Sequence, residues 1–257
     1  MSYLDAVILG ILQGLTEFLP VSSSGHLVLG EAILGVRQSG VAFEVMVHLG
    51  TLAAVLVYFR EPIGRLVQCL ICSEMKAERR MLAYLAVGTI PAGLVGVLFK
   101  DHFEAMFDSP LAVSMMLFVT GGLLLSTRWI PGQRRELSVI AAIIIGCGQA
   151  LAILPGISRS GSTIATGLWL GIEPSKAAEF SFLLAIPAIA GAAVLSLGDL
   201  GSLASSLWGP YLVGALVSFV VALGAVYLVL ETVRRGKLSW FAYYCFAAGC
   251  LGLYLFV

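Results

Sequence analysis

Long apolar stretches dominate the chain and leave few folds open to it. Six of them are uninterrupted and close to the length of about 20 residues that a helix needs to cross a bilayer: 43–59, 81–99, 111–130, 178–197, 211–231 and 239–257. Only 12% of the 257 residues are charged, whereas soluble domains carry about 25%. The sequence therefore predicts an all-α polytopic membrane protein, a single membrane domain over 1–257 with six transmembrane helices. It offers no basic face for nucleic acid.

Two further apolar segments, 4–35 and 138–172, are interrupted near their middle by Pro, Gly and Ser. Each half has about 15 residues, which is too short to span a bilayer alone. Non-helical backbone at membrane depth is tolerated only where protein or a watery cavity satisfies its polar groups. We therefore expect each segment to form a re-entrant helical hairpin.

Basic residues gather on one side of the predicted spans. That side carries Arg60, Arg65, Lys76, Arg79, Arg80, Arg128, Arg134, Arg135, Lys176, Arg234, Arg235 and Lys237, and the other side Arg37 and Lys100 with Asp101, Glu104, Asp108 and Asp199. The positive-inside rule places 60–80, 128–137 and 232–238 in the cytoplasm. Hairpin 4–35 then enters from the outside and hairpin 138–172 from the cytoplasm. Their polar tips should meet near the midplane.

The two halves of the chain repeat a pattern. Gly10 and Gln13 match Gly146 and Gln149 at an offset of 136, Leu19-Pro20 matches Leu154-Pro155 at 135, and Ser22 to Gly25 matches Ser158 to Gly161 at 136. We expect two structural repeats, 1–135 and 136–257, each a hairpin plus three spans, with the second inverted. Inverted repeats with broken helices occur in transporters, so the pattern also allows a transport function.

The first break places a carboxylate and an amide on one helix face, because Gln13 and Glu17 are spaced i, i+4. Such oxygens are hard ligands that suit Mg²⁺, with Ca²⁺ possible, held together with waters and substrate phosphate. The alternative is that Glu17 pairs with Arg159 for structure alone. In the second half Ile153 stands where Glu17 would be, so that half has lost any such pair.

Hydroxyls and an imidazole follow in the same break. Pro20 ends the first arm, and Ser22, Ser23 or Ser24 can cap the second arm. His26 lies three and four residues after Ser23 and Ser22, so its ring is expected to reach one of their hydroxyls. A hydroxyl beside an imidazole is the minimal activated nucleophile. The alternative is a helix cap beside a satisfied histidine.

The second break supplies an anion-binding group. Arg159 stands between Ser158 and Ser160, and its guanidinium is a rigid fork of donors matched to phosphate oxygens. A helix that starts near Ser160 would direct its backbone N–H groups and positive dipole end to the same point. Ser162 and Thr163 add hydroxyl donors. The two breaks together hold the parts that phosphoryl transfer requires.

Two other pairs of polar residues lie at membrane depth. Glu44 and His48 are spaced i, i+4 in the first span, and Glu179 with Ser181 opens the fourth. Glu44 and Glu179 are equivalent under the repeat. The equivalence predicts that these pairs anchor the hairpins, with contact to substrate as the alternative.

The motifs resemble those of a known family. Gln13-x-x-x-Glu17 followed by Phe-Leu-Pro-Val-Ser-Ser-Ser-Gly-His26, together with Pro155-Gly-Ile-Ser-Arg-Ser-Gly-Ser-Thr163, is similar to the undecaprenyl-pyrophosphate phosphatase family, also called bacitracin-resistance proteins. The similarity covers essentially the whole chain. It implies a multi-pass enzyme of the bacterial inner membrane, open to the outer (periplasmic) face. Such an enzyme removes the terminal phosphate of undecaprenyl pyrophosphate and regenerates the undecaprenyl phosphate carrier of cell-wall synthesis, with Mg²⁺ as the usual cation.

The resemblance also implies roles for residues. It places Glu17 and Gln13 at the metal, Arg159 on the pyrophosphate, and Ser23 with His26 at the nucleophile and its acid/base partner. We expect the substrate to contact Arg159 and the hydroxyls of Ser22, Ser24, Ser158, Ser160 and Thr163. Many family members have Glu where this chain has Gln13, so the cation meets one negative charge fewer.

Three alternatives remain open from the sequence. Either Ser23 attacks the terminal phosphorus, or His26 activates a water that does so. The same inverted-repeat frame also suits a flippase of undecaprenyl phosphate. Small-residue runs at 185–193 and 214–225 are able to pack helices within one chain or between two chains, which allows a homodimer among the membrane lipids.

Overall fold

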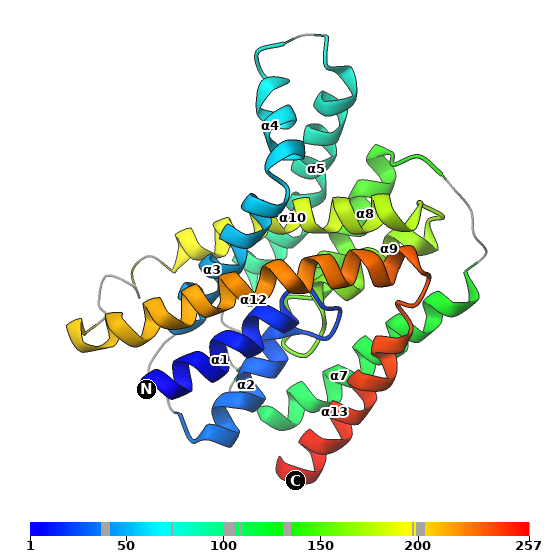
Figure 1. The fold of residues 1–257 in the computed structure, drawn as a ribbon. Coiled ribbons are helices and arrows are strands. Elements are labelled where there is room, and N and C mark those ends of the chain that lie inside the picture. The colour runs from blue at the N-terminus through cyan, green and yellow to red at the C-terminus, as the bar shows by residue number, and fades with distance from the viewer. Residues whose placement is uncertain are drawn as a thin grey trace.

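The structure is a computed structural model that describes residues 1–36, 42–72, 74–99, 106–107, 109–130, 135–196, 198 and 204–256. Its helices are α1 (Tyr3–Thr16), α2 (Ser23–Leu34), α3 (Ala42–Tyr58), α4 (Arg60–Gln68), α5 (Lys76–Leu98), α7 (Pro110–Ser126), α8 (Val139–Leu151), α9 (Arg159–Trp169), α10 (Pro174–Leu195), α12 (Trp208–Arg234) and α13 (Trp240–Phe256) (Figure 1). Short 3₁₀ helices η1 (Thr127–Trp129) and η2 (Ser205–Leu207) adjoin α7 and α12. Within the described ranges the β-pairing is one isolated bridge between Arg135 and Ile172. The predicted all-α fold is confirmed.

All six predicted spans are helical. Among the described helices, four are long and apolar enough to cross a membrane: α5, α7 with η1, α10, and α12 with η2. Helix α3 reaches that length only with α4, and the two are bent by 76° at their junction. Helix α13 is apolar and has 17 residues, near the lower limit of about 17 for a span. Some of the charged residues on which the topology prediction depends lie outside the described residues: Arg37, Lys100, Asp101, Glu104, Asp108, Arg134 and Asp199.

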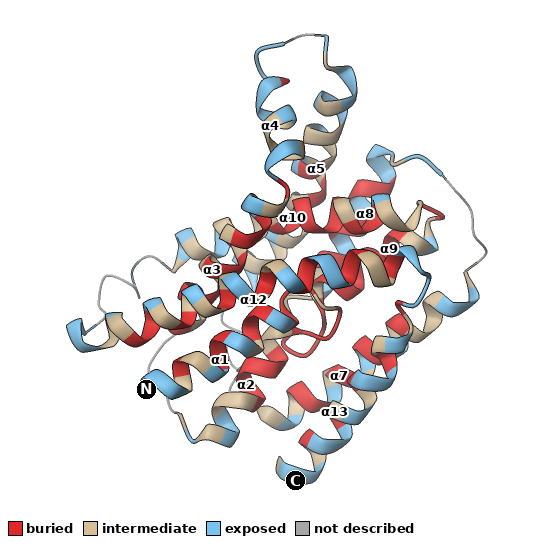
Figure 2. Ribbon diagram, in the orientation of Figure 1, coloured by how far each residue is buried: buried red, intermediate tan, exposed pale blue. Residues whose placement is uncertain are grey.

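The two broken segments form hairpins, α1 with α2 and α8 with α9. Their arms have 14, 12, 13 and 11 residues, so none is longer than about 21 Å, against a hydrocarbon core of about 30 Å. The breaks at 17–22 and 152–158 lie side by side in the middle of the bundle (Figure 1). Most of their residues are buried (Figure 2). The prediction that the two tips meet is confirmed.

Each hairpin packs on a span from the other half of the chain. Helix α1 lies along α12, and α8 lies along α5. Glycines allow both crossings. A Cβ on Gly10 would stand 2.6 Å from the carbonyl oxygen of Gly214, and a Cβ on Gly146 would come closer still to that of Gly88. Gly10 and Gly146 are partners in the sequence repeat, and small residues let membrane helices approach closely. The boundary at 135 and the inversion stay predictions.

Part of the small-residue run on α12 packs within the chain. Gly214, Ser218 and Ala222 are buried on α12, and the Ser218 hydroxyl donates to the carbonyl oxygen of Val47 on α3 at 2.8 Å. The run on α10 lines a cavity described below. A homodimer stays a prediction.

Candidate active site

The end of α1 carries the acidic centre of the site. Glu17 is the residue that caps the C-terminus of α1, and it is 6% exposed, while Gln13 is fully buried. The Gln13 side-chain amide donates from Nε2 to Glu17 Oε2 at 2.9 Å. The expected shared face of these two residues is therefore confirmed.

Ser22 fixes the first break. It caps α2, as one of the three expected serines, with its Oγ accepting from the Gly25 backbone N–H at 3.3 Å. The same oxygen accepts from the backbone N–H of Gly156, in the second break, at 3.1 Å. Ser22 has φ 69°, a conformation that costs a non-glycine residue on the order of 1–3 kcal/mol. The two backbone donors hold it there.

The second break is fixed by a residue that the sequence did not single out. Thr120 of α7 donates to the carbonyl oxygen of Gly156 at 2.7 Å and accepts from the backbone N–H of Ser158 at 3.0 Å. Ser158 caps α9 through the Gly161 N–H at 3.0 Å. Gly156 has φ 95° and a Cβ there would meet the backbone of Val113, so the turn requires glycine.

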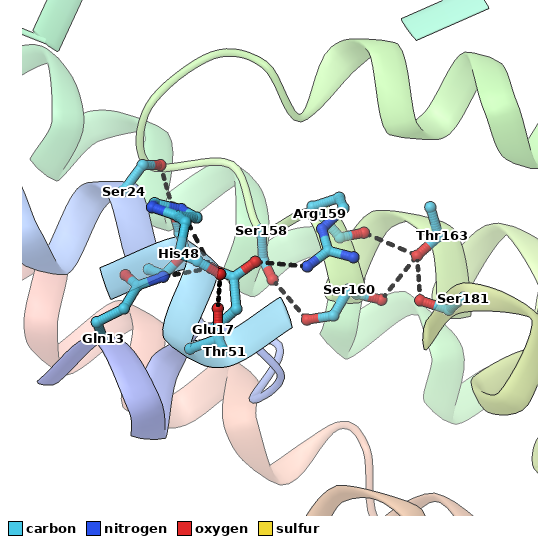
Figure 3. Close-up of polar contacts among 12 residues, drawn as sticks. Gln13, Glu17, Ser24, His48, Thr51, Ser158, Arg159, Ser160, Thr163 and Ser181 are labelled. Carbon is cyan, nitrogen blue, oxygen red and sulfur yellow. Dashed lines mark hydrogen bonds and ion pairs between the residues drawn. The ribbon is translucent and has the colours of Figure 1, made fainter. Parts of the chain in front are cut away.

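The tips are joined by direct side-chain contacts (Figure 3). Arg159 Nη2 donates to Glu17 Oε1 at 2.6 Å, and the side chains are 15% and 4% exposed. The Ser160 hydroxyl donates to the Leu19 carbonyl oxygen at 3.2 Å. A carboxylate from one hairpin and a guanidinium from the other therefore form one buried ion pair.

The expected contact between His26 and a serine hydroxyl is wrong. His26 Nδ1 lies 2.8 Å from the carbonyl oxygen of Ser22, and Nε2 lies 2.8 Å from the hydroxyl of Tyr244 on α13. Nδ1 must carry the proton because a carbonyl oxygen only accepts. The side chain of a helical residue points back toward the preceding turn. Here the imidazole contacts a backbone carbonyl oxygen and not a serine Oγ. The catalytic role of His26 stays a prediction.

Ser23 faces the carboxylate instead. Its Oγ donates to Glu17 Oε2 at 2.5 Å. The imidazole nearest to that oxygen belongs to His48 of α3, with Nε2 at 3.4 Å. His48 was expected to anchor a hairpin. Its spacing to Glu44 identifies a neighbour on its own helix, so the contact with Glu17 across helices could not be read from the sequence.

The hydroxyls of the second tip point in two directions. Thr163 donates to the carbonyl oxygen of Arg159 at 2.8 Å and lies 2.6 Å from the Ser181 hydroxyl of α10. Ser160 lies 3.2 Å from the Ser158 hydroxyl. Ser181 therefore anchors the hairpin, as predicted, and Thr163 and Ser160 form hydrogen bonds within the hairpin frame. Contact of Ser160 and Thr163 with substrate stays a prediction. Ser22, Ser24 and Ser158 line the cavity that adjoins the site.

That cavity has a volume of about 850 Å³. Its polar end is formed by Glu17, His48, Arg159, Gln149 and the serines of both breaks. Its walls are largely apolar and come from 89–97 of α5 and 187–196 of α10. The site is thus the polar end of a mainly apolar space between helices.

Several buried polar atoms of the two hairpins lack hydrogen-bond partners among the described residues: Gln13 Oε1, both side-chain atoms Nε2 and Oε1 of Gln149, Arg159 Nη1 and Ser162 Oγ. Of these residues, Gln149 and Arg159 line the cavity. Buried polar groups are nearly always hydrogen-bonded, so an unpaired set beside a cavity indicates where a polar ligand binds. The sequence noted Gln149 only as the counterpart of Gln13 and missed this position. The repeat was the signal that pointed to it.

The donor set fits a hard cation shared with substrate. No three His, Cys, Asp or Glu side chains gather as a metal site in the part of the chain that the structure describes. Glu17 supplies a carboxylate, and Gln13 Oε1 is buried and unpaired. Mg²⁺ usually binds through one or two protein oxygens, with water and phosphate as its other ligands.

Known proteins are similar in sequence to this chain over nearly its full length. The family model described as bacitracin resistance protein BacA matches residues 6–251. A protein of Salinibacter ruber named undecaprenyl-diphosphatase is 41% identical over 270 aligned residues, which cover 99% of this chain and 100% of that protein. Proteins of the same name from Syntrophotalea carbinolica and Bacteroides thetaiotaomicron are each 44% identical, with 97% of both chains covered. The chain belongs to the bacitracin resistance protein BacA family.

Proposed function

We propose that this protein hydrolyses the terminal phosphate of undecaprenyl pyrophosphate. The products are inorganic phosphate and undecaprenyl phosphate, the lipid carrier for cell-wall synthesis. The observation that carries the proposal is the cluster of Glu17, Arg159 and Ser23 at the polar end of an apolar cavity. The relatives' shared name favours this reaction over a flippase.

The pyrophosphate binds to the second tip. Arg159 keeps Nη1 unpaired while Nη2 holds Glu17, so the guanidinium is able to bridge the carboxylate and a phosphate oxygen. The Gln149 amide is unpaired at the same end and donates a further hydrogen bond. The N-terminus of α9 adds its dipole.

The attacking group approaches from the first tip. In one route Ser23 Oγ bonds to the terminal phosphorus, the bridging P–O bond breaks, and undecaprenyl phosphate leaves with the serine proton on its freed oxygen. Water then hydrolyses the phosphoserine. In the other route water attacks directly, and Ser23 with Glu17 orients it. Both routes place the nucleophile opposite Arg159, which stabilises the charge on the transferred phosphoryl group.

Mg²⁺ is the proposed cation, with Ca²⁺ as an alternative, and Glu17 with Gln13 would hold it. When bound, it neutralises phosphate charge and orients the pyrophosphate. Arg159 occupies Glu17 Oε1, so Oε2 is the oxygen that would serve as the ligand.

The cavity faces the outer side in the predicted topology. Its walls come from the C-terminal halves of α5 and α10 and the N-terminal turn of α3, which the charge pattern places outside the inner membrane. Both termini lie at the end of the molecule away from α4 (Figure 1), as this topology requires. The polyprenyl tail would follow the apolar walls toward the lipids.

The test is phosphate release from undecaprenyl pyrophosphate by purified protein with Mg²⁺. Arg159→Gln should lower kcat/KM by about 10²–10³-fold, because a transition-state donor is lost. Arg235→Gln is the matched control, since Arg235 is exposed and paired with Glu231 on the far end of α12. Absence of phosphate release by the unaltered protein would refute the proposal.

A further inference from the structure

We propose that His48 is a third ligand of the cation site, so that this chain binds divalent transition-metal ions, with Mn²⁺ as the probe, more tightly than Glu17 and Gln13 would alone. The inference rests on the proposed function in taking Glu17 and Gln13 as the cation site. The three side chains come from two helices, α1 and α3.

The ring of His48 is oriented as a metal ligand is. Nδ1 lies 2.6 Å from the carbonyl oxygen of Glu44, and a carbonyl oxygen only accepts, so Nδ1 carries the hydrogen. In the neutral ring the lone pair is therefore on Nε2, which faces Glu17 Oε2 at 3.4 Å. A ring N–H on a backbone carbonyl is the usual support of a metal-binding histidine.

The distances between the three groups match those between ligands of one ion. Nε2 of His48 is 3.4 Å from Glu17 Oε2, and the Gln13 amide is 2.9 Å from the same oxygen. Two ligands that are each about 2.1 Å from an ion lie roughly 3.0–3.4 Å apart at angles near 90–110°. A half-turn of the Gln13 amide exchanges its nitrogen for Oε1, which is buried and unpaired among the described residues.

The charges of the site favour a nitrogen ligand. The Glu17 carboxylate is already paired with Arg159, so the pair offers little net negative charge to a hard cation held mainly by charge. An imidazole binds through its lone pair and suits transition-metal ions such as Fe²⁺ or Zn²⁺ better than Mg²⁺. The His48 side chain is 28% exposed and lines the cavity, so an ion has access to it.

His26 provides a matched control within the same protein. Both of its ring nitrogens are engaged, by the Ser22 carbonyl oxygen and the Tyr244 hydroxyl. Replacing His26 with Gln removes an imidazole without removing a ligand of the proposed site. His48→Gln makes the same chemical change at the site itself.

The experiment is electron spin-echo envelope modulation of the purified protein loaded with Mn²⁺, which detects ¹⁴N bound to the ion. We expect imidazole ¹⁴N modulation in the unaltered protein and in His26→Gln, and its loss in His48→Gln. Titration should show Mn²⁺ affinity reduced by roughly 10–100-fold in His48→Gln, and Mg²⁺ affinity reduced less.

The outcomes separate this inference from the proposed function. Absence of ¹⁴N modulation in the unaltered protein overturns the inference. Modulation that persists in His48→Gln also overturns it. If phosphate is still released with Mg²⁺ in that case, the phosphatase proposal stands. Nitrogen-bound Mn²⁺ without any phosphate release would leave the ligand in place and refute the reaction.

Discussion

At the scale of single residues, the site is organised by one buried carboxylate. Glu17 Oε1 accepts from Arg159, while Oε2 accepts from Gln13 and Ser23 and faces His48. A buried charge that loses its partner costs about 3–5 kcal/mol. The ion pair therefore holds the two tips together. It also orients the Arg159 guanidinium, whose Nη1 is left to bind phosphate.

Glu17→Gln should destabilise the protein by several kcal/mol on this basis and weaken its dependence on Mg²⁺. Thermal unfolding in detergent and a Mg²⁺ titration of phosphate release measure the two effects. The double variant Glu17→Gln, Arg159→Gln should recover part of the stability, since no charge is left unpaired, but none of the activity. An unchanged Mg²⁺ titration in Glu17→Gln would remove the metal assignment.

Ser23→Ala distinguishes the two nucleophiles. If Ser23 attacks phosphorus, the variant should lose at least about 10³-fold in kcat, as loss of a nucleophile does, and a phosphoenzyme should be trapped in the unaltered protein by rapid acid quench. Turnover that survives in Ser23→Ala but not in His26→Ala would reject the covalent route. Tyr244→Phe is the companion control, because it frees Nε2 of His26 without removing the ring.

Gln149→Leu tests the unpaired amide. A hydrogen bond to a charged group contributes about 1.5–3 kcal/mol, so KM should rise by roughly 10–100-fold while the Mg²⁺ dependence is unchanged. Gln68→Leu makes the same replacement at the exposed end of α4 and should leave phosphate release unaltered. Equal KM values for the unaltered protein and Gln149→Leu would show that the amide does not bind substrate.

At the scale of elements, the hairpins depend on glycine crossings with spans of the opposite half. The paired crossings, α1 on α12 and α8 on α5, bring backbones into contact at Gly10 and Gly146. These contacts position the two breaks, because each short arm lacks the length to fix its own depth in the bilayer.

Gly146→Ala and Gly10→Ala should each lower the stability by about 1–3 kcal/mol, because the added methyl overpacks the crossing. Gly224→Ala on α12 is the control, because a Cβ there meets no heavy atom within 4 Å. Alanine also has a higher helix propensity than glycine, so this variant should not lose stability. Thermal unfolding in one detergent compares the three. Equal melting temperatures for Gly146→Ala and Gly224→Ala would contradict the close crossing.

At the scale of the whole molecule, the orientation decides which face of the membrane the site serves. Cys72 is exposed and lies in the segment 60–80 that the charge pattern places in the cytoplasm. In a variant whose other cysteines are alanine, a membrane-impermeant maleimide should label Cys72 only after the cells are permeabilised. Ser206→Cys lies on η2, at the N-terminal end of α12 and away from the cytoplasmic segment 232–238. This cysteine should be labelled in intact cells. The reverse labelling pattern would invert the topology.

Much of this architecture can be predicted from the amino-acid sequence. The length of the apolar runs set the helices. Pro20 and Pro155 lie within the two breaks, where a proline cannot continue a helix, and Ser22 and Ser158 cap the helices that follow. The repeat then indicated that the breaks belong together. These are local effects, which depend on residues a few positions apart and can therefore be predicted from the sequence.

Which side chains contact one another depends on how the helices pack. His26 pairs with Tyr244 and not with a serine, His48 faces Glu17, and Thr120 holds the second break. Each of these contacts joins helices that are distant in sequence. A helical pattern gives the face on which a residue lies but not the neighbour that packs there. The chain thus specified the acidic, basic and hydroxyl groups of the site, and the packing of two hairpins between spans of opposite halves specified their partners.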